Sequence, residues 1–312
     1  RPLFNLNNLN ILRYYYSTKK NELIDHLKKS IRETGPISIA QYMREVLTNS
    51  LSGYYMTGDV FGIFGRQGDF VTSPEISQIF GELMGIWFLT QWQSQGKPDK
   101  IQVVELGPGR GTLLYDMLNV KIIISIVAIL YNFRLIVASV PTKASIALTG
   151  SLAYKMFKIG DRIEISPDSM EISKQIANHI KSNGGASLII DYGQDFIQGN
   201  TLRAIKHHEF VHPLSEPGQA DLSADVNFCY LKESVTNLAY GPITQSKFLQ
   251  SLGIKARLLI LLKSALYTKH KDLISSTERL VHPSAMGEIY KVLAFVPKGS
   301  LKVPIAFEKS NN

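Results

Sequence analysis

The sequence predicts an α/β fold in which a mostly parallel sheet is flanked by helices. The first supporting observation is that apolar strand-like stretches alternate with amphipathic helical stretches along much of the 312 residues. The second is a glycine-rich turn that follows an apolar strand expected at 101–106 and precedes a helical segment at 112–118. The third is the apolar stretch 186–192, which finishes in Asp191-Tyr192-Gly193; ligand groups often gather at such strand ends, although Asp191 could also only brace the turn.

Two helices are expected near the N-terminus. Residues 21–34 carry apolar side chains at helical spacing, and Gly35-Pro36 ends this helix. Ser38 stands three residues before Gln41, a capping-box pattern that starts a second helix. The apolar face of the first helix consists of Leu23, Ile24, Leu27 and Ile31.

The best-defined helix is expected to start at Ser73-Pro74-Glu75. The serine supplies a hydroxyl N-cap, the proline occupies the first helical position, and the glutamate places a carboxylate in the first turn. Its apolar face consists of Ile76, Ile79, Phe80, Leu83, Met84, Trp87 and Phe88. The remaining expected elements are a helix from Ser166-Pro167 to Asn183, a short helix over 245–252 and a strand over 289–296.

Composition and charge exclude several classes of protein. Hydrophobic residues make up 45% and charged residues 19% of the chain, which is ordinary for a globular protein. The single cysteine, Cys229, excludes an internal disulfide and a cysteine-based zinc site, and no metal site is expected. Half of the net charge of +8 comes from basic residues that precede Glu22, and the rest is scattered, so we expect no nucleic-acid partner.

Two segments differ from the rest of the chain. Residues 1–20 are basic and free of acids, as in a mitochondrial transit segment, although a flexible basic terminus has the same composition. Residues 117–160 also contain no Asp or Glu, and 121–140 are nearly all apolar. This stretch could form a transmembrane helix, two buried strands, or be sequence that is not native coding sequence; Asn132 and Arg134 count against the membrane span.

The glycine-rich turn predicts a nucleotide-type cofactor site. Its glycines stand at alternate positions, whereas the dinucleotide fingerprint requires a different spacing. Glu105, two residues before the first glycine, is typical of S-adenosylmethionine (SAM) sites, where it can accept from the ammonium group of the methionine part. An ordinary glycine-rich turn remains the alternative. The expected SAM-binding residues are Glu105, Gly107, Pro108, Gly109, Arg110, Gly111 and Thr112.

Several separate motifs resemble the MidA-like mitochondrial protein arginine methyltransferases, which are complex I assembly factors with bacterial relatives. The most specific is the run Gly-Asp-Phe-Val-Thr-Ser-Pro-Glu at 68–75. Matching motifs also stand at 35–47, 53–55, 80–82, 104–111, 191–193 and 220–226. Together the similar regions cover roughly 31–119 and 161–296.

The resemblance implies a Rossmann-like SAM-dependent methyltransferase fold with an N-terminal helical extension. It further implies methylation of an arginine in a matrix-arm subunit of complex I in the mitochondrial matrix, with no stable membrane insertion. In that case 1–20 is the transit segment, 21–100 the helical and loop region with the signature, and 101–312 the methyltransferase core.

The resemblance also directs attention to three carboxylates around the signature. Arginine methylation needs carboxylates that orient the guanidinium, for which Glu75, Asp69 and Glu82 are the candidates. Helix capping by Glu75 and a salt bridge of Glu82 are the alternatives. His207 and His208 are expected to be surface residues.

The chain departs from the family in its middle. The family has an acidic residue for the cofactor ribose after the glycine turn and a later His/Asn-Glu-Phe-Phe-Asp segment, and this chain has neither. The sheet is therefore expected to be incomplete. Three functions follow: an active arginine methyltransferase whose native product contains the missing part, a non-catalytic assembly or binding protein, and a nicotinamide oxidoreductase, which the glycine spacing disfavours.

We predict that the chain as printed shows no measurable methyl transfer, because the ribose acceptor and the acidic segment are both missing. The measurement is incorporation of a labelled methyl group from SAM into an arginine peptide of complex I. Robust turnover by residues 21–312 would contradict this prediction.

Overall fold

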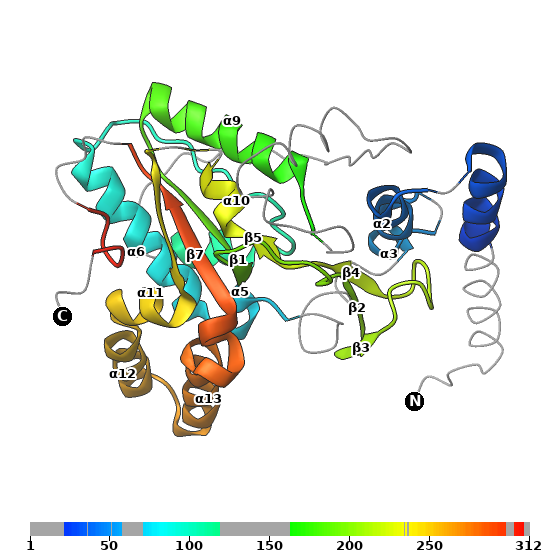
Figure 1. Ribbon diagram of the computed structural model, residues 1–312. Helices are drawn as coiled ribbons and strands as arrows, with labels where there is room; N and C mark the ends of the chain where they lie inside the picture. The colour runs from blue at the N-terminus through cyan, green and yellow to red at the C-terminus, as the bar shows by residue number, and fades with distance from the viewer. Residues whose placement is uncertain are drawn as a thin grey trace. The chain divides into compact units, whose positions relative to one another are not determined.

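The computed structural model describes residues 22–35, 37–50, 52–57, 71–118, 163–233, 235, 237–297 and 303–308. The chain divides into two compact units. Unit 1 contains the N-terminal helices and residues 201–224. Unit 2 contains all the other described residues, which are 71–118, 163–200 and those from 225 onward (Figure 1). The expected transit segment and the apolar stretch 121–140 lie outside the described residues.

Unit 2 is built on a four-stranded sheet with the order β5-β1-β7-β6. Its strands are β1 (Ser187–Gln194), β5 (Val226–Asn227), β6 (Ala239–Thr244) and β7 (Tyr290–Phe295). Only β1 and β5 pair in parallel, while β7 runs antiparallel to both β1 and β6. The described sheet is thus mixed, which corrects the expectation of a mostly parallel one: the last strand returns between β1 and β6 and opposes both.

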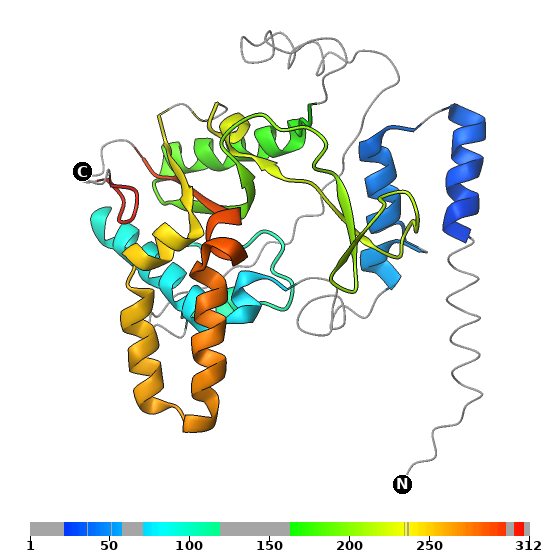
Figure 2. The same ribbon diagram turned by 60° about the horizontal axis from the view of Figure 1, so that its bottom comes forward.

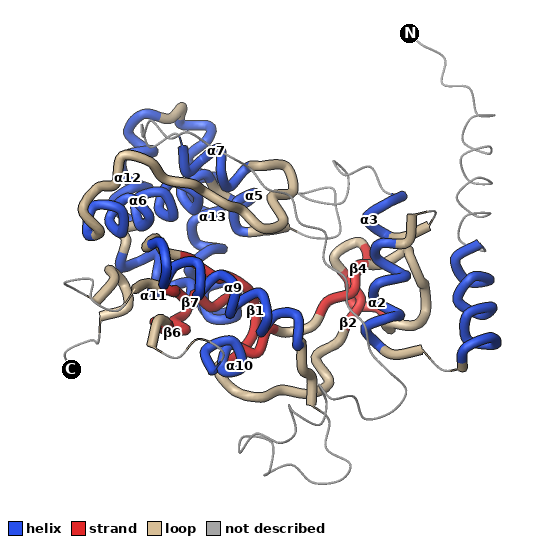
Figure 3. Tube along the Cα trace, turned by 90° about the horizontal axis from the view of Figure 1, so that it is seen from above, coloured by secondary structure: helices blue, strands red, loops and turns tan. Residues whose placement is uncertain are grey.

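Helices cover both faces of this sheet. Alternate residues of β7 enter different cores, because successive side chains of a strand point to opposite faces. Val292 and Ala294 pack with α6 (Gln78–Ser94) and α11 (Gln245–Ser251), whereas Leu293 and Phe295 pack with α9 (Pro167–Asn183) and α10 (Phe228–Glu233). All four are fully buried. Unit 2 is therefore a three-layer α/β/α arrangement, as expected of the fold class (Figures 1 and 3).

Unit 1 joins helices to a small antiparallel sheet of order β3-β2-β4. Its strands are β2 (Arg203–Lys206), β3 (Glu209–Val211) and β4 (Asp221–Ser223), and its helices are residues 22–34, α2 (Ile39–Thr48) and α3 (Tyr54–Thr57). The core of this unit consists of Leu23, Leu27, Tyr42, Val46, Ala204, Ala220 and Leu222. Of the predicted apolar face, Leu23 and Leu27 are buried, whereas Ile31 is exposed.

Most predicted helix starts are confirmed by capping hydrogen bonds. The Ser38 hydroxyl accepts from the Gln41 N–H at 3.1 Å, and the Ser166 hydroxyl accepts from the Ser169 N–H at 3.4 Å. Gly184 ends α9 with a φ of 75°. These capping interactions join residues within one helical turn, so they can be predicted from the local sequence.

The helix expected to run on from Ser73 is interrupted. A short helix, α5 (Ser73–Ile76), has Thr72 as its N-cap, and the backbone then extends at Ser77, whose hydroxyl caps α6. The Ser73 hydroxyl instead donates to Oε1 of the buried Gln245 at 3.0 Å. The local pattern could not predict this break, because the competing partner lies 172 residues away.

The strand expected at 101–106 does not form among the described residues. A strand needs a neighbour for its backbone groups, and no described strand pairs with this segment. Val104 and Leu106 are 48% and 45% exposed, as expected for an apolar segment without its sheet. The predicted helix after the turn is confirmed as α7 (Thr112–Leu118).

Two glycines allow α6 to approach α7 closely. A Cβ on Gly81 would lie 2.5 Å from the Cβ of Asp116, and one on Gly85 would lie 2.7 Å from the carbonyl oxygen of Met117. Neither distance is possible for real atoms without movement of a helix. The pair of glycines one helical turn apart therefore determines how near α7 sits to the central helix of unit 2.

A helical hairpin between β6 and β7 was not predicted. It consists of α12 (Ile254–Ser264), the short η2 (Tyr267–Lys269) and α13 (His270–Val281), and it projects from the rest of unit 2 (Figure 2). A single π-helical turn, η3 (Pro283–Gly287), leads from α13 into β7. None of the helices in the described ranges combines the length and the apolar character that a bilayer crossing requires.

We predict that Gly85→Ala lowers the free energy of unfolding by about 1–3 kcal/mol, because the added methyl group meets the backbone of α7. This loss should outweigh the gain in helix propensity, which is at most about 1 kcal/mol. Urea unfolding measures both terms. Gln93→Ala, at an exposed position of α6, is the control, and a Gly85→Ala variant as stable as the parent would contradict the packing described.

Candidate active site

The glycine-rich turn adopts a backbone that favours glycine. The φ values of Gly107, Gly109 and Gly111 are 69°, 52° and 74°, all in the left-handed region. A Cβ built on any of the three would meet no atom of the described residues within 4 Å. The backbone conformation therefore favours glycine at these positions, and no described residue fills the space beside them.

Glu105 stands before the turn with an unused acceptor. Its Oε2 atom is buried and has no hydrogen-bond partner among the described residues. Burial raises the pKa of this carboxyl above its ordinary value. A buried acceptor of this kind requires a partner, and a ligand ammonium group would satisfy it and favour the charged carboxylate.

These features fit the methionine end of SAM. Glu105 offers the acceptor for the ammonium group, and the turn offers room for close approach to the backbone. Pro108 and Thr112 are half-buried, and Arg110 is exposed. The position where a ribose carboxylate is expected falls within 119–162, outside the described residues.

The short helix α5 (Ser73–Ile76) brings the end of the signature next to α7, which follows the glycine-rich turn. α5 carries Glu75 in its first turn and contacts α6, α7 and α13. The Oε2 atom of Glu75 is buried and lacks a hydrogen-bond partner within the described part of the chain. The backbone N–H of Glu75 donates to the Thr72 carbonyl at 3.0 Å, as in the first turn of a helix. Asp69 lies outside the described residues.

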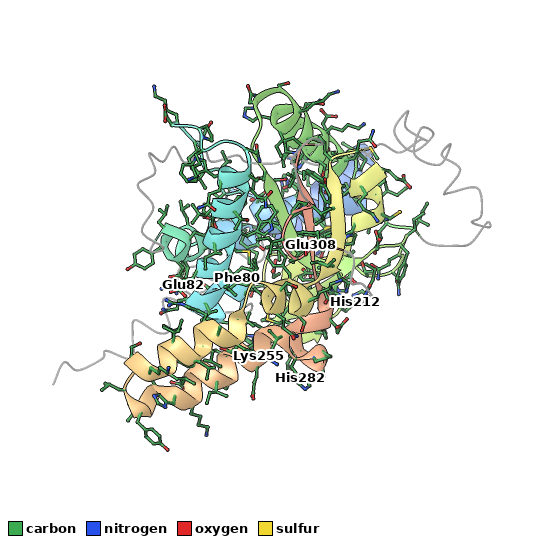
Figure 4. The ribbon with its side chains drawn as sticks, turned by 90° about the vertical axis from the view of Figure 1, so that its left-hand side faces the viewer. Phe80, Glu82, His212, Lys255, His282 and Glu308 are labelled. Atoms are coloured by element: carbon green, nitrogen blue, oxygen red, sulfur yellow. The ribbon has the colours of Figure 1, made fainter. Side chains whose placement is uncertain are left out.

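The carboxylate of Glu82 is already paired with an arginine of the chain. Nε and Nη2 of Arg257 on α12 donate to its two oxygens, each at 2.7 Å, and Gln78 donates to Oε1 at 3.2 Å (Figure 4 labels Glu82). Glu82 is 7% exposed. This is the bidentate geometry that carboxylates offer to guanidinium groups. The pairing of Arg257 with Glu82 could not be predicted, because no local signal in the sequence links α12 to α6.

A second buried carboxyl lies beside this ion pair. Asp116 on α7 is 7% exposed. Burial and then the charge of Glu82 raise its pKa from 3.8 to about 6. The close approach of α6 and α7 therefore places two carboxyl groups in one poorly solvated space, of which only Glu82 has a guanidinium partner described here.

The other polar residues singled out from the sequence have structural positions. Asp191 lies within β1 and not at its end, and its Oδ1 accepts from the N–H of Tyr192 at 2.8 Å. His207 and His208 form the tight turn between β2 and β3, both with positive φ. Among the described residues, no group of three or more His, Cys, Asp or Glu could hold a metal ion.

We predict that the stabilisation of the fold by Asp116→Asn grows between about pH 4 and about pH 6 and stays constant at higher pH. Because the folded state binds this proton more tightly than the unfolded chain, stability falls as pH rises from about 4 to about 6. The variant should gain about 1–3 kcal/mol at about pH 7.5 and nothing at about pH 3.5. Urea unfolding at both pH values measures the gain. Asp99→Asn, at an exposed site, is the control, and an equal effect at both pH values would contradict the prediction.

Comparison with known proteins identifies relatives along almost the whole chain. The sequence model of a family of S-adenosyl-L-methionine-dependent methyltransferases matches residues 83–121 and 132–242. Protein arginine methyltransferase NDUFAF7, mitochondrial, from Xenopus laevis is 34% identical over 381 residues, covering 91% of this chain and 86% of the relative. The human protein of that name is 32% identical and covers 90% and 84%, and the Drosophila melanogaster homolog is 33% identical and covers 88% and 85%.

The alignments also bear on the middle of the chain. The alignment with the frog relative is longer than the 312 residues of this chain, so dozens of its positions have no counterpart here. The family match is interrupted between residues 121 and 132, inside the stretch without acids. The family match resumes at residue 132, so most of the stretch without acids resembles the family, which corrects the expectation that the similar regions leave out 120–160.

Solved structures support the fold. A COG1565 superfamily member from Burkholderia thailandensis, bound to S-adenosyl-homocysteine, matches with a TM-score of 0.72 at 19% identity, covering 94% of this chain and 96% of that one. A native structure from the same organism matches with a TM-score of 0.71. Together with the relatives above, these findings show that the chain belongs to the SAM-dependent methyltransferase family that includes the mitochondrial protein arginine methyltransferases.

Proposed function

We propose that the protein is a SAM-dependent protein arginine N-methyltransferase that acts on a matrix-arm subunit of complex I in the mitochondrial matrix and supports complex I assembly. The observation that carries this proposal is the buried Oε2 of Glu105, which has no hydrogen-bond partner among the described residues and precedes three left-handed glycines that no described side chain crowds. The relatives, named as mitochondrial arginine methyltransferases, supply the substrate class and the compartment.

In this proposal the residues around the turn hold the cofactor. Glu105 accepts hydrogen bonds from the ammonium group, and the turn from Gly107 to Gly111 lets the backbone lie against the ligand. Thr112 and α7 fix the end of the turn, since the Tyr115 N–H donates to the Gly111 carbonyl at 3.0 Å. When bound, SAM supplies a methyl group on a sulfonium, which a guanidinium nitrogen can attack.

The signature carboxylates orient the substrate. Glu75 has a buried oxygen free among the described residues, so we assign it to accept from the substrate guanidinium and hold the attacking nitrogen in line. Asp69, which belongs to the same signature at 68–75, is the second candidate for this task. As the nitrogen–carbon bond forms and the carbon–sulfur bond breaks, the nitrogen loses a proton, which a carboxylate or water accepts.

Glu82 takes a positioning role in this scheme. Its oxygens are committed to Arg257, so a substrate guanidinium would have to displace an existing bidentate pair. The pair joins α12 to α6 directly beside α7, and it thereby supports the end of the cofactor turn. The pair matches the salt-bridge alternative that the sequence left open for Glu82.

A non-catalytic assembly or binding protein is the second candidate function. The observation that favours it is the missing counterpart of dozens of residues of the relative, together with the lack of any acid between Asp116 and Asp161. Sequencing the transcript across the codons for Asp116 to Ile165 separates the two functions. A longer reading frame with acidic residues supports the enzyme, and the sequence as printed supports the binding protein.

We predict that Glu105→Gln weakens SAM binding by about 10- to 100-fold, because a charge-assisted hydrogen bond to the ammonium group is lost. Ligand-observed NMR titration measures dissociation constants into the millimolar range, which suits a site without its ribose acceptor. Glu171→Gln, at an exposed position of α9, is the matched control. Equal affinity in the parent and Glu105→Gln would remove Glu105 from the site.

A further inference from the structure

The outer side of the α12–α13 hairpin exposes large apolar side chains. Leu259 and Ile260 on α12 are 61% and 56% exposed, and Leu266 and Tyr267 at the tip are 76% and 86% exposed. Ile274 on α13 is 40% exposed. Single exposed apolar residues are common, but five on one projecting hairpin form a surface that needs an explanation.

Lysines surround these side chains. Lys255 and Lys263 lie one turn before and after the pair Leu259-Ile260, and Lys269 and Lys271 follow the tip. All four are exposed, and none forms an ion pair with a carboxylate of the described residues. We call these nine residues the hairpin surface: Lys255, Leu259, Ile260, Lys263, Leu266, Tyr267, Lys269, Lys271 and Ile274. Figure 4 labels Lys255 on α12.

Other charged residues on the hairpin do not cancel the positive charge of these four lysines. Asp272 and Glu278 on α13 are the acids, and Arg279 on the same helix offsets one of them. Arg257 points inward to Glu82. The exposed part of the hairpin therefore remains positively charged.

The base of the hairpin is firmly packed. Ile254 and Leu280 are fully buried, and Thr277 is 4% exposed. The Arg257–Glu82 pair fastens α12 to α6. Since the inner faces of both helices are already used, the exposed side chains are not required for the internal core of unit 2.

We propose that the hairpin surface docks peripherally on an anionic lipid bilayer. Leu266 and Tyr267 would enter the headgroup region, where aromatic rings are favoured, and the lysines would contact lipid phosphates while their stems lie along the apolar side chains. No helix needs to cross the bilayer. The docking is independent of methyl transfer and goes beyond the proposed function.

Lipid fits this surface better than a second copy of the chain or an apolar groove in another protein. Two copies that met through the hairpin surface would bring eight lysines together, and like charges at an interface are costly. Lysines interrupt the apolar side chains along the hairpin, and an apolar groove would leave their ammonium groups without partners. Alternating apolar and basic residues are typical of helices that lie in the membrane interface.

The test is co-sedimentation of the full chain with vesicles. We expect binding to phosphatidylcholine vesicles in which about a third of the lipid is phosphatidylglycerol, little binding to pure phosphatidylcholine, and weakening with salt. Leu266→Ser with Tyr267→Ser should lower the partition coefficient about tenfold. Lys263→Ala with Lys269→Ala should lower it about 25-fold, since each lysine contributes about fivefold.

Matched variants separate the hairpin from the general positive charge of the chain. Phe196→Ser replaces an aromatic side chain that is 59% exposed outside the hairpin, and Lys174→Ala with Lys181→Ala replaces two exposed lysines of α9. Both should bind like the parent, with circular dichroism confirming that every variant is folded. Absence of binding to the anionic vesicles, equal binding of the hairpin and control variants, or dimerisation through the hairpin in sedimentation velocity would each overturn the proposal.

Discussion

The close contact between α6 and α7 is the constraint on which the rest of unit 2 depends. Gly81 and Gly85 remove the side chains that would hold the helices apart, so the backbone of α7 rests directly on α6. Because α7 begins where the glycine-rich turn ends, this contact also determines where the turn lies. The motif around Gly81 therefore supports the proposed cofactor site through packing.

The same contact has an electrostatic consequence. It brings Asp116 close to Glu82 in a space with little water, which raises the pKa of Asp116 to about 6. The guanidinium of Arg257 compensates Glu82 with two hydrogen bonds. One helix, α12, thus serves two surfaces: its inner side neutralises a buried carboxylate beside the cofactor turn, and its outer side presents lysines and apolar residues to the solvent.

The methionine end of the proposed site awaits a ligand. Within the described part of the chain, the buried Oε2 of Glu105 has no hydrogen-bond partner and no residue fills the space beside the glycine turn, so a charged ligand would complete both features. The strand that should support this end lacks a described neighbour, so Val104 and Leu106 stay exposed. Relatives carry dozens of additional positions, and the family match breaks within the stretch that would follow α7.

Helix starts and ends could be predicted from the amino-acid sequence, because their signals lie within a few neighbouring residues. The caps at Ser38 and Ser166 and the helix after the turn are as predicted, because hydrogen bonds within one helical turn specify them. The family and the SAM pattern at Glu105 also came from short motifs. Only the tertiary structure decided the break at Ser77, the antiparallel β7 and the Glu82–Arg257 pair. Each of these joins residues far apart in the chain, and no pattern along one segment contains the position of its partner.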